Sequence, residues 1–224
     1  MPRIARVVAT RYPHHVTQRG NNRTDVFFDD EDRQYYLKTL KNYCEKCKVA
    51  IWAYCLMANH VHLLAVPAAA ESLARCIGST NLLYTQYVNR KYGRSGRLWQ
   101  NRFFSTIIDT DQYVWAVARY IEQNPVKAKL VQKPEDYRWS SCKATISGKG
   151  DDLVSGHKWL DDTDRKDYRK FLRQEDSETE QKIRQATSTG RPLGREGFIK
   201  KLERKLSRRL LPGKAGRPKK NKTN

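Results

Sequence analysis

The order of apolar and polar positions along the chain predicts seven elements between residues 12 and 124. Short apolar or alternating runs bounded by Gly, Pro or Asn are typical of strands, whereas apolar residues three or four positions apart are typical of helices. The predicted strands cover 12–19, 49–57, 60–66 and 105–108, and the predicted helices cover 29–48, 71–92 and 109–124. This order indicates a ferredoxin-like split βαβ arrangement, which is an α+β fold with a central antiparallel sheet.

Local signals place several boundaries of these elements. Asp29-Asp30-Glu31-Asp32 puts negative charge at the start of the first helix, where the helix dipole favours it. Asn124-Pro125 is expected to end the last helix, because proline disfavours helical geometry in the residue before it. Only Ala58-Asn59 separates the second and third strands, so these two strands are predicted to form an antiparallel hairpin.

The third strand carries two histidines one residue apart. In a strand, residues i and i+2 share a face, so His60 and His62 project side by side while Val61 points into a core. Two imidazoles on a rigid strand are half of a metal site, since histidine is a common metal ligand. A half-buried, hydrogen-bonded pair with no metal role is the alternative, and the spacing alone leaves both open.

Composition and charge narrow the class of partner. The 224 residues suffice for one well-packed domain with appendages, and the net charge of +20 indicates a polyanionic partner. The chain has no apolar run long enough for a transmembrane helix and no signal peptide at its start, so we expect a cytoplasmic, nucleoid-associated protein without membrane contact. The five cysteines, including the C-x-x-C of Cys44 and Cys47, are interpreted as reduced thiols, with a zinc site as the minor alternative.

Two predicted loops combine basic, amide and aromatic residues suited to nucleic acid. The first follows the strand at 12–19, and the second precedes the strand at 105–108. A solvated loop is the alternative for the first, and the start of a core strand is the alternative for the second. The candidate DNA contacts are Arg19, Asn22, Arg23, Arg94, Arg97, Trp99, Gln100 and Arg102.

The composition changes after residue 150, which predicts three regions: a domain at 1–150, a helical or irregular extension at 151–189, and a basic tail at 190–224. The tail holds thirteen Lys and Arg against two Glu, a net charge of +11. Its residues 198–206 could form a basic amphipathic helix. Arg217 and Lys219 belong to a Gly-Arg-Pro sequence similar to an AT-hook, which enters A·T-rich minor grooves. A non-specific basic tail is the alternative.

Four motifs occur in register: VTQRGN at 16–21, YCLMANHVHLL at 54–64, GRLWQNR at 96–102 and RYIEQNPV at 119–126. Together they resemble the single-tyrosine HUH transposases of the IS200/IS605 kind. They resemble most closely the bacterial REP-associated tyrosine transposases. The resemblance covers residues 8–145, with YRWSS at 137–141 near its end.

The resemblance implies the HUH nuclease fold and a set of site residues. His60 and His62 would be the metal-binding histidines, and Tyr120 would be the nucleophile. Asn124 would stand where the insertion-sequence relatives have a glutamine that completes the metal site, although asparagine is shorter and Pro125 follows it. The metal would be Mg²⁺ or Mn²⁺. REP-type hairpin DNA with single-stranded flanks would be the substrate, and the REP-associated relatives are expected to act as monomers.

The function predicted on this basis is a metal-dependent single-stranded DNA endonuclease and strand transferase that forms a covalent 5′-phosphotyrosine intermediate. Two alternatives stay open. One is a non-catalytic DNA- or RNA-binding protein on the same fold, and the other is a metal phosphoesterase that uses water. Among the twelve tyrosines, Tyr113 is the second candidate for the nucleophile, two turns before Tyr120 on the same predicted helix.

Overall fold

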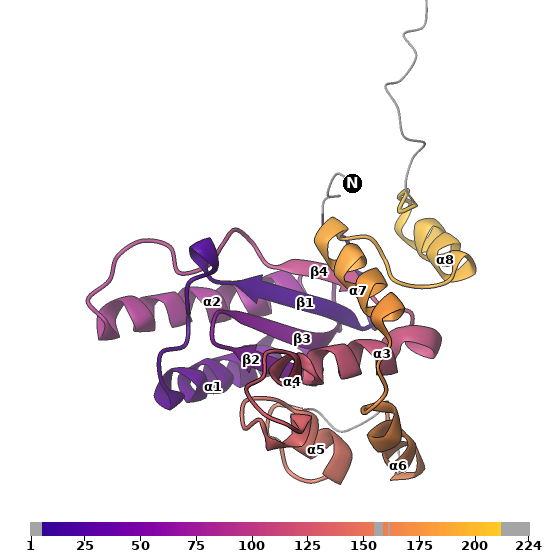
Figure 1. Cartoon of the computed structure of the whole chain (residues 1–224). Helices are drawn as coiled ribbons and strands as arrows, with labels where there is room; N and C mark the ends of the chain where they lie inside the picture. The colour runs from indigo at the N-terminus through magenta and orange to yellow at the C-terminus, as the bar shows by residue number, and fades with distance from the viewer. Residues whose placement is uncertain (1–5, 155–158, 161, 212–224) are drawn as a thin grey trace, which may run out of the picture.

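A four-stranded antiparallel sheet forms the centre of the protein (Figure 1). The computed structural model describes residues 6–154, 159–160 and 162–211. The strands follow the order β2-β3-β1-β4, and every neighbouring pair is antiparallel. This order is that of the ferredoxin-like fold, so the fold predicted from the sequence is confirmed. The strands are β1 (His14–Arg19), β2 (Val49–Met57), β3 (His60–Pro67) and β4 (Phe104–Ile107).

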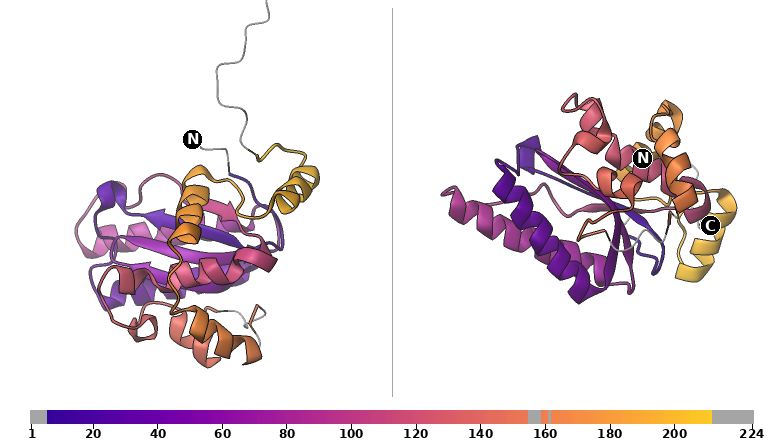
Figure 2. Two further views of the ribbon diagram at one scale, coloured as in Figure 1. Left: turned by 45° about the vertical axis from the view of Figure 1, so that its right-hand side comes forward. Right: turned by 90° about the horizontal axis from the view of Figure 1, so that it is seen from below.

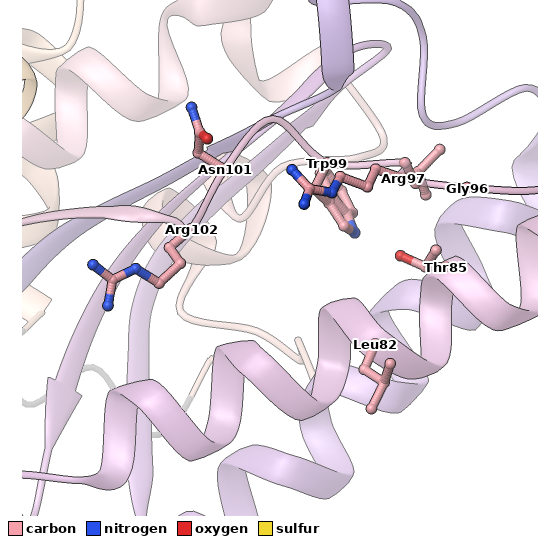
Figure 3. A pocket seen from close by; sticks show the side chains of 8 residues that line it. Leu82, Thr85, Gly96, Arg97, Trp99, Asn101 and Arg102 are labelled. Carbon is pink, nitrogen blue, oxygen red and sulfur yellow. The ribbon is translucent and has the colours of Figure 1, made fainter.

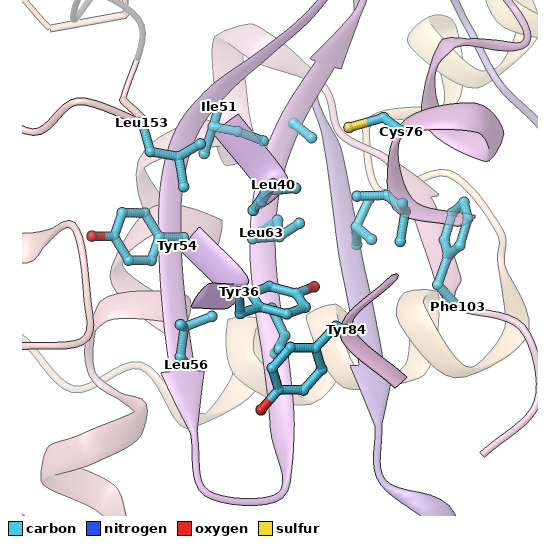
Figure 4. Packing of buried hydrophobic residues seen from close by; sticks show 14 of the residues in the cluster. Tyr36, Leu40, Ile51, Tyr54, Leu56, Leu63, Cys76, Tyr84, Phe103 and Leu153 are labelled. Atoms are coloured by element: carbon cyan, nitrogen blue, oxygen red, sulfur yellow. The ribbon is translucent and has the colours of Figure 1, made fainter. Parts of the chain in front are cut away.

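One face of the sheet is covered by α1 (Asp30–Cys47) and α2 (Ser72–Lys91), which lie together on one side in the right-hand view of Figure 2. Figure 4 shows the core between these helices and the sheet, where Tyr36 and Leu40 of α1 meet Tyr84 of α2 and Leu63 of β3. These four side chains are at most 1 % exposed, so this layer is fully desolvated. Burying each such side chain contributes about 1.5–3 kcal/mol to folding.

The predicted boundaries of α1 and of the hairpin agree closely with the structure. Asp29 caps α1, and the side chains of Asp29 and Asp32 accept reciprocal backbone hydrogen bonds in a capping box. The β2–β3 hairpin turns at residues 58–59, with Met57 opposite His60.

The opposite face of the sheet carries α3 (Thr110–Glu122). After α3 the chain adds one further turn, α4 (Asn124–Lys127), where we expected it to leave the helix. Pro125 is tolerated there because it lies in the first turn of α4, where a backbone N–H has no partner within the helix. The short elements elsewhere are η1 (Asn21–Arg23) and η2 (Pro134–Asp136).

Most of the described region after residue 127 packs on the side of the sheet that carries α3, and α8 packs separately against Val7 and Ile107. Its helices are α5 (Cys142–Ser147), α6 (Asp162–Phe171), α7 (Ser177–Thr189) and α8 (Glu196–Leu206). Tyr168 and Leu172 of α6 and Ile183 of α7 share one hydrophobic cluster with Val117 and Ile121 of α3. In Figure 1, α7 crosses in front of β1 and β4. The described part of the extension is therefore built onto the sheet.

The predicted amphipathic stripe of the basic tail is present in α8. Leu202 is fully buried against Val7 and Ile107, and Phe198 packs edge-on against Tyr12 with ring centroids 5.7 Å apart. No helix in the described ranges is long and apolar enough to cross a membrane.

A buried carboxylate joins α3 to α5 and α6. Glu122 is fully buried and accepts hydrogen bonds from Ser141 Oγ at 2.9 Å, Thr145 Oγ1 at 2.6 Å and Tyr168 Oη at 2.9 Å. Burial raises the pKa of Glu122, and the three hydroxyl donors partly offset this effect. The bond from Tyr168 ties the extension to the helix that carries Tyr120, and the bonds from Ser141 and Thr145 tie α5 to the same helix.

Tyr168→Phe removes one of these donors and leaves the ring in place. We expect the free energy of unfolding, measured by urea titration, to fall by about 1–3 kcal/mol, because a carboxylate oxygen loses a buried partner. Leu130→Ala is the control, since Leu130 is 54 % exposed and its truncation should change stability by at most about 0.5 kcal/mol. Equal stability of Tyr168→Phe and the parent would show that this bond does not hold the extension.

Candidate active site

Strand register brings three histidines to the sheet face that α3 and α7 cover. His62 of β3 lies opposite Thr17 of β1, and His15, two residues before Thr17, shares its face. The rings of His15 and His62 stack with centroids 5.2 Å apart, and the ring of His60 meets that of His62 edge-on at 4.9 Å. The predicted pairing of His60 and His62 on one face is therefore present, and β1 adds a third imidazole.

Each of these rings has at least one nitrogen in a hydrogen bond. His60 Nδ1 lies 2.5 Å from Asn59 Oδ1, and His62 Nδ1 lies 3.0 Å from His15 Nε2. Burial lowers the pKa of His60 to about 4 and of His15 to about 3, and it lowers the pKa of His62 well below its ordinary value. The three rings are consequently neutral at neutral pH, which is the form that binds metals.

Tyr120 of α3 faces this cluster. Its ring is edge-on to both His15 and His62, with centroids 5.7 Å apart in each case. Two cations flank the same ring: Lys127 Nζ is 5.6 Å from the centroid and Arg184 Cζ is 6.0 Å from it. Glu180 of α7 forms an ion pair with Lys127 and lies 3.9 Å from Arg184. Tyr113, the second candidate nucleophile, packs against the hydrophobic cluster around α3 and does not line the histidine cavity.

These side chains open into one cavity of about 410 Å³. β1 and β3 form its floor, α3 supplies one wall and α7 another. Arg19 and Gln100, two of the candidate DNA contacts, stand at the same cavity. Its lining includes His15, His60, His62, Tyr120, Arg184 and Thr187.

The donor set fits a divalent cation in part. Two neutral imidazoles each hold Nδ1 in a hydrogen bond and keep a second ring nitrogen for a ligand. Within the described ranges, no cluster of three or more His, Cys, Asp and Glu side chains could hold a metal. A cation here would thus complete its coordination with oxygen ligands from water or substrate.

The structure does not bring Asn124 into this set. Asn124 Nδ2 donates to the backbone oxygens of Tyr120 at 2.6 Å and of Ile121 at 3.3 Å, so the side chain closes the end of α3. Asn124 is absent from the lining of the cavity. His60 and His62 remain the metal-ligand candidates, without Asn124.

The two predicted contact loops lie side by side next to the cavity. Gly20 bridges to Trp99, and Gln100 N donates to Arg19 O at 2.8 Å. A Cβ on Gly20 would lie 2.2 Å from Thr24 O, so only glycine permits this turn. Asn22 and Arg23 follow in left-handed conformation with exposed side chains.

The second loop also lines a shallow hollow of about 760 Å³ against α2 (Figure 3). Arg97 and Arg102 stand on the loop side, and Leu82, 59 % exposed, stands on α2. Trp99 is only 8 % exposed, and its Nε1 donates to Asn81 O at 3.3 Å. The indole therefore packs in the core, which is the alternative stated for this segment, and it also forms part of the wall of the hollow.

Three further candidate DNA contacts lie away from the cavity lining or outside the described residues. Arg94 is exposed, and its guanidinium lies 5.5 Å from the ring centroid of Phe28. Arg217 and Lys219 lie outside the described residues.

Comparison with known proteins decides the family. The model of the family described as "Transposase IS200 like" matches residues 8–124, which is more than half of the chain. The chain belongs to the IS200-like transposase family. This transposase is also 29 % identical over 133 residues to a Haemophilus influenzae protein named as a REP-associated tyrosine transposase, covering 54 % of this chain and 73 % of the relative. The resemblance carried by the sequence motifs, and the prediction of a transposase, are confirmed.

One solved structure supports the fold of this IS200-like transposase. The structure of a REP-associated tyrosine transposase bound to a REP hairpin matches with a TM-score of 0.57 at 18 % identity, covering 72 % of this chain and 94 % of the other. A transposase structure from Deinococcus radiodurans has a TM-score of 0.39 at 16 % identity, covering 54 % and 96 %.

The sequence did not reveal His15, Thr187, Arg184 or Lys127 as parts of the candidate site. His15 could have been found only by aligning β1 with β3, because its face follows from the strand pairing. Lys127 lies one turn beyond the point where we expected the helix to end. Thr187 and Arg184 lie on α7, beyond the four motifs and the family match.

Burial of the histidines on β1 and β3 makes the stability of the protein depend on pH. The unfolded chain takes up protons below the ordinary pKa of 6.5, whereas folded His14 and His60 stay neutral down to about pH 4 and His15 down to about pH 3. The stabilisation present above pH 6.5 is therefore lost as the pH falls toward 4. In EDTA, the free energy of unfolding by urea should be lower at pH 5 than at pH 7.

Glu122 acts in the opposite direction, because a raised carboxyl pKa favours folding as the pH falls. The measurement is therefore repeated with Glu122→Gln, in which the loss between pH 7 and pH 5 should be larger. A stability that is flat or rising on acidification in Glu122→Gln would contradict the neutral state of the buried histidines.

Proposed function

We propose that this transposase is a metal-dependent single-stranded DNA endonuclease and strand transferase that acts on REP-type hairpin DNA. Tyr120 is the nucleophile, and His60 and His62 are the metal ligands. The observation that carries the proposal is the shared cavity in which the Tyr120 ring stands edge-on to His62, with two cations beside it. No other side chain on the described part of α3 is a potential nucleophile that faces both the histidines and the two cations.

The cofactor we propose is Mg²⁺ or Mn²⁺. When bound, the ion polarises the scissile phosphate and offsets the negative charge that develops on it. Two neutral imidazoles with further oxygen ligands are compatible with either ion. His60 and His62 would hold the ion from a strand whose face also meets the ring of Tyr120.

The remaining chemistry belongs to the chain. Tyr120 Oη attacks phosphorus and loses its proton, the bond from phosphorus to the 3′ oxygen breaks, and that oxygen leaves as a 3′-hydroxyl after gaining a proton. The product is a 5′-phosphotyrosine, and attack by another 3′-hydroxyl reverses the step and joins strands. Lys127 and Arg184 both place positive charge within about 6 Å of the centroid of the Tyr120 ring. They therefore stabilise the negative charge of a phosphate bound beside this ring.

The substrate class is supported by charge and by the fold. A net charge of +20 favours a polyanion, and the exposed Arg19, Arg97 and Arg102 border the cavity or the neighbouring hollow. The solved structure that matches with a TM-score of 0.57 is that of a transposase bound to a REP hairpin. We propose that the hairpin lies along the two contact loops and that its single-stranded flank enters the cavity.

Tyr120→Phe tests the nucleophile. The mutant keeps the ring that packs against His15 and His62, so folding, Mn²⁺ binding and hairpin binding should survive. Incubated with end-labelled hairpin DNA and Mn²⁺, it should form no protein–DNA adduct on denaturing gels and cut nothing, whereas the parent forms the adduct.

Tyr113→Phe is the matched control on the same helix and should stay active. An adduct formed by Tyr120→Phe would overturn the assignment. Cleavage by both mutants without any adduct would assign the attack to water, and binding without cleavage by the parent would indicate a non-catalytic DNA-binding protein.

Arg97 and Arg102 test the contact loop. The double variant Arg97→Ala, Arg102→Ala should bind the hairpin more weakly, and the log–log dependence of affinity on salt should become shallower by about 0.7–0.9 for each phosphate that the loop no longer neutralises. Binding is measured by fluorescence anisotropy between low and moderate salt. Lys143→Ala, an exposed lysine on α5, is the control and should leave the slope unchanged. An unchanged slope in the double variant would remove this loop from the DNA interface.

A further inference from the structure

A chain of three hydrogen bonds connects α7 to the metal-ligand candidate on β3. Thr187 Oγ1 lies 2.8 Å from the backbone oxygen of Ile183 and 2.9 Å from His15 Nδ1, and His15 Nε2 lies 3.0 Å from His62 Nδ1. The side chains of Thr187, His15 and His62 are at most 9 % exposed. Buried polar atoms depend on such partners, because water does not replace a missing one.

The direction of the chain follows from its first link. A backbone oxygen can only accept, so the single hydroxyl proton of Thr187 is donated to Ile183 O. Thr187 Oγ1 can then only accept from His15, which places the ring proton of His15 on Nδ1. His15 Nε2 is left as a bare acceptor, and the bond of 3.0 Å requires that His62 carries its proton on Nδ1.

The opposite tautomer of His62 would be costly here. It would place two unprotonated ring nitrogens 3.0 Å apart inside a buried cluster, with no proton between them. A buried polar group without a hydrogen-bond partner is unfavourable, so the tautomer of His62 that makes the bond dominates.

We propose that Thr187 and His15 are positioning residues that hold His62 as its Nδ1-protonated tautomer, leaving Nε2 as the nitrogen that binds the metal. The inference rests on the proposed role of His62 as a ligand. Partners behind a ligating histidine fix its tautomer and ring orientation in this way. Here the partner comes from α7, outside the segment that matches the family model.

The two ligand histidines are held differently. His60 Nδ1 bonds to the side chain of its own neighbour, Asn59, so its tautomer is set locally. The tautomer of His62 is set by residues that lie 47 and 125 positions away in the sequence. Perturbing α7 should consequently affect His62 and leave His60 unchanged, which gives the experiment an internal reference.

Thr187→Val tests the first link, because it removes the hydroxyl and retains the shape. Long-range ¹H–¹⁵N NMR of the imidazoles, recorded on the full metal-free chain, should show His62 protonated on Nδ1 in the parent and a mixture of tautomers in Thr187→Val. Mn²⁺ affinity, measured by electron paramagnetic resonance titration, should fall about 10–100-fold. Thr187→Ser keeps the hydroxyl and should restore both readouts.

Thr189→Val is the matched control. Thr189 lies on the same helix, is 6 % exposed and makes the same bond to the backbone oxygen four residues back, but it touches no histidine in the described part of the chain. It should leave the tautomer of His62 and the Mn²⁺ affinity unchanged. An equal loss in Thr189→Val would mean that α7 acts only through packing, and this would overturn the proposal.

The remaining outcomes are also decisive. Protonation of His62 on Nε2 in the parent, or a parental tautomer and Mn²⁺ affinity in Thr187→Val, would refute the inference. The NMR readout needs neither metal nor DNA, so it is independent of cleavage. If the parent forms no tyrosine adduct but His62 shows the expected tautomer, the proposed function fails while the hydrogen-bond chain stands.

Discussion

The antiparallel pairing of β1 with β3 is the constraint on which the site depends. The register that sets Thr17 opposite His62 also puts His15 on the face of His62 and Arg19 beside His60. A shift by one residue would turn Val16 and Gln18 toward the cavity and bury His15 among the residues of the opposite core. Because Val16, Val61 and Leu63 fill the core under α1 and α2, hydrophobic packing fixes the register and with it the geometry of the imidazoles.

The position of α3 over the sheet is the second constraint on the site. Tyr120 reaches the histidines because α3 lies across β2 and β3, held through Val117 and Ile121 in the apolar cluster and through Glu122 in a buried polar network. One face of α3 therefore packs in the core while Tyr120 of the same helix lines the cavity. Helices α6 and α7 pack in the same apolar cluster, and α7 thereby forms one wall of the cavity.

Much of this arrangement could be predicted from the sequence, because it follows from residue patterns within single strands and helices. The strand period placed His60 and His62 together, the helical period placed Tyr120 on α3, and charge at the helix ends located α1. The features that the sequence could not predict depend on distant partners. Trp99 sits in an aromatic-rich segment that suits DNA, but Tyr36 and Tyr84 enclose it, and no local pattern reveals that enclosure. Asn124 has the spacing of a ligand, yet the end of α3 offers its amide two carbonyl oxygens at closer range. His15 and Thr187 are 172 residues apart and meet only after the chain has folded.

The position of α7 along the chain has a consequence for protein synthesis. Both strand histidines and the tyrosine leave the ribosome well before residue 187, since they all lie within the first 120 residues. A nascent or prematurely terminated chain can thus form the sheet and display the reactive side chains while the group behind His62 is still missing. On the proposed role of His62, firm metal binding would then be gained late in translation, when α7 closes the last wall of the cavity, and a chain that ends before α7 would hold the metal weakly even though it contains both ligand candidates.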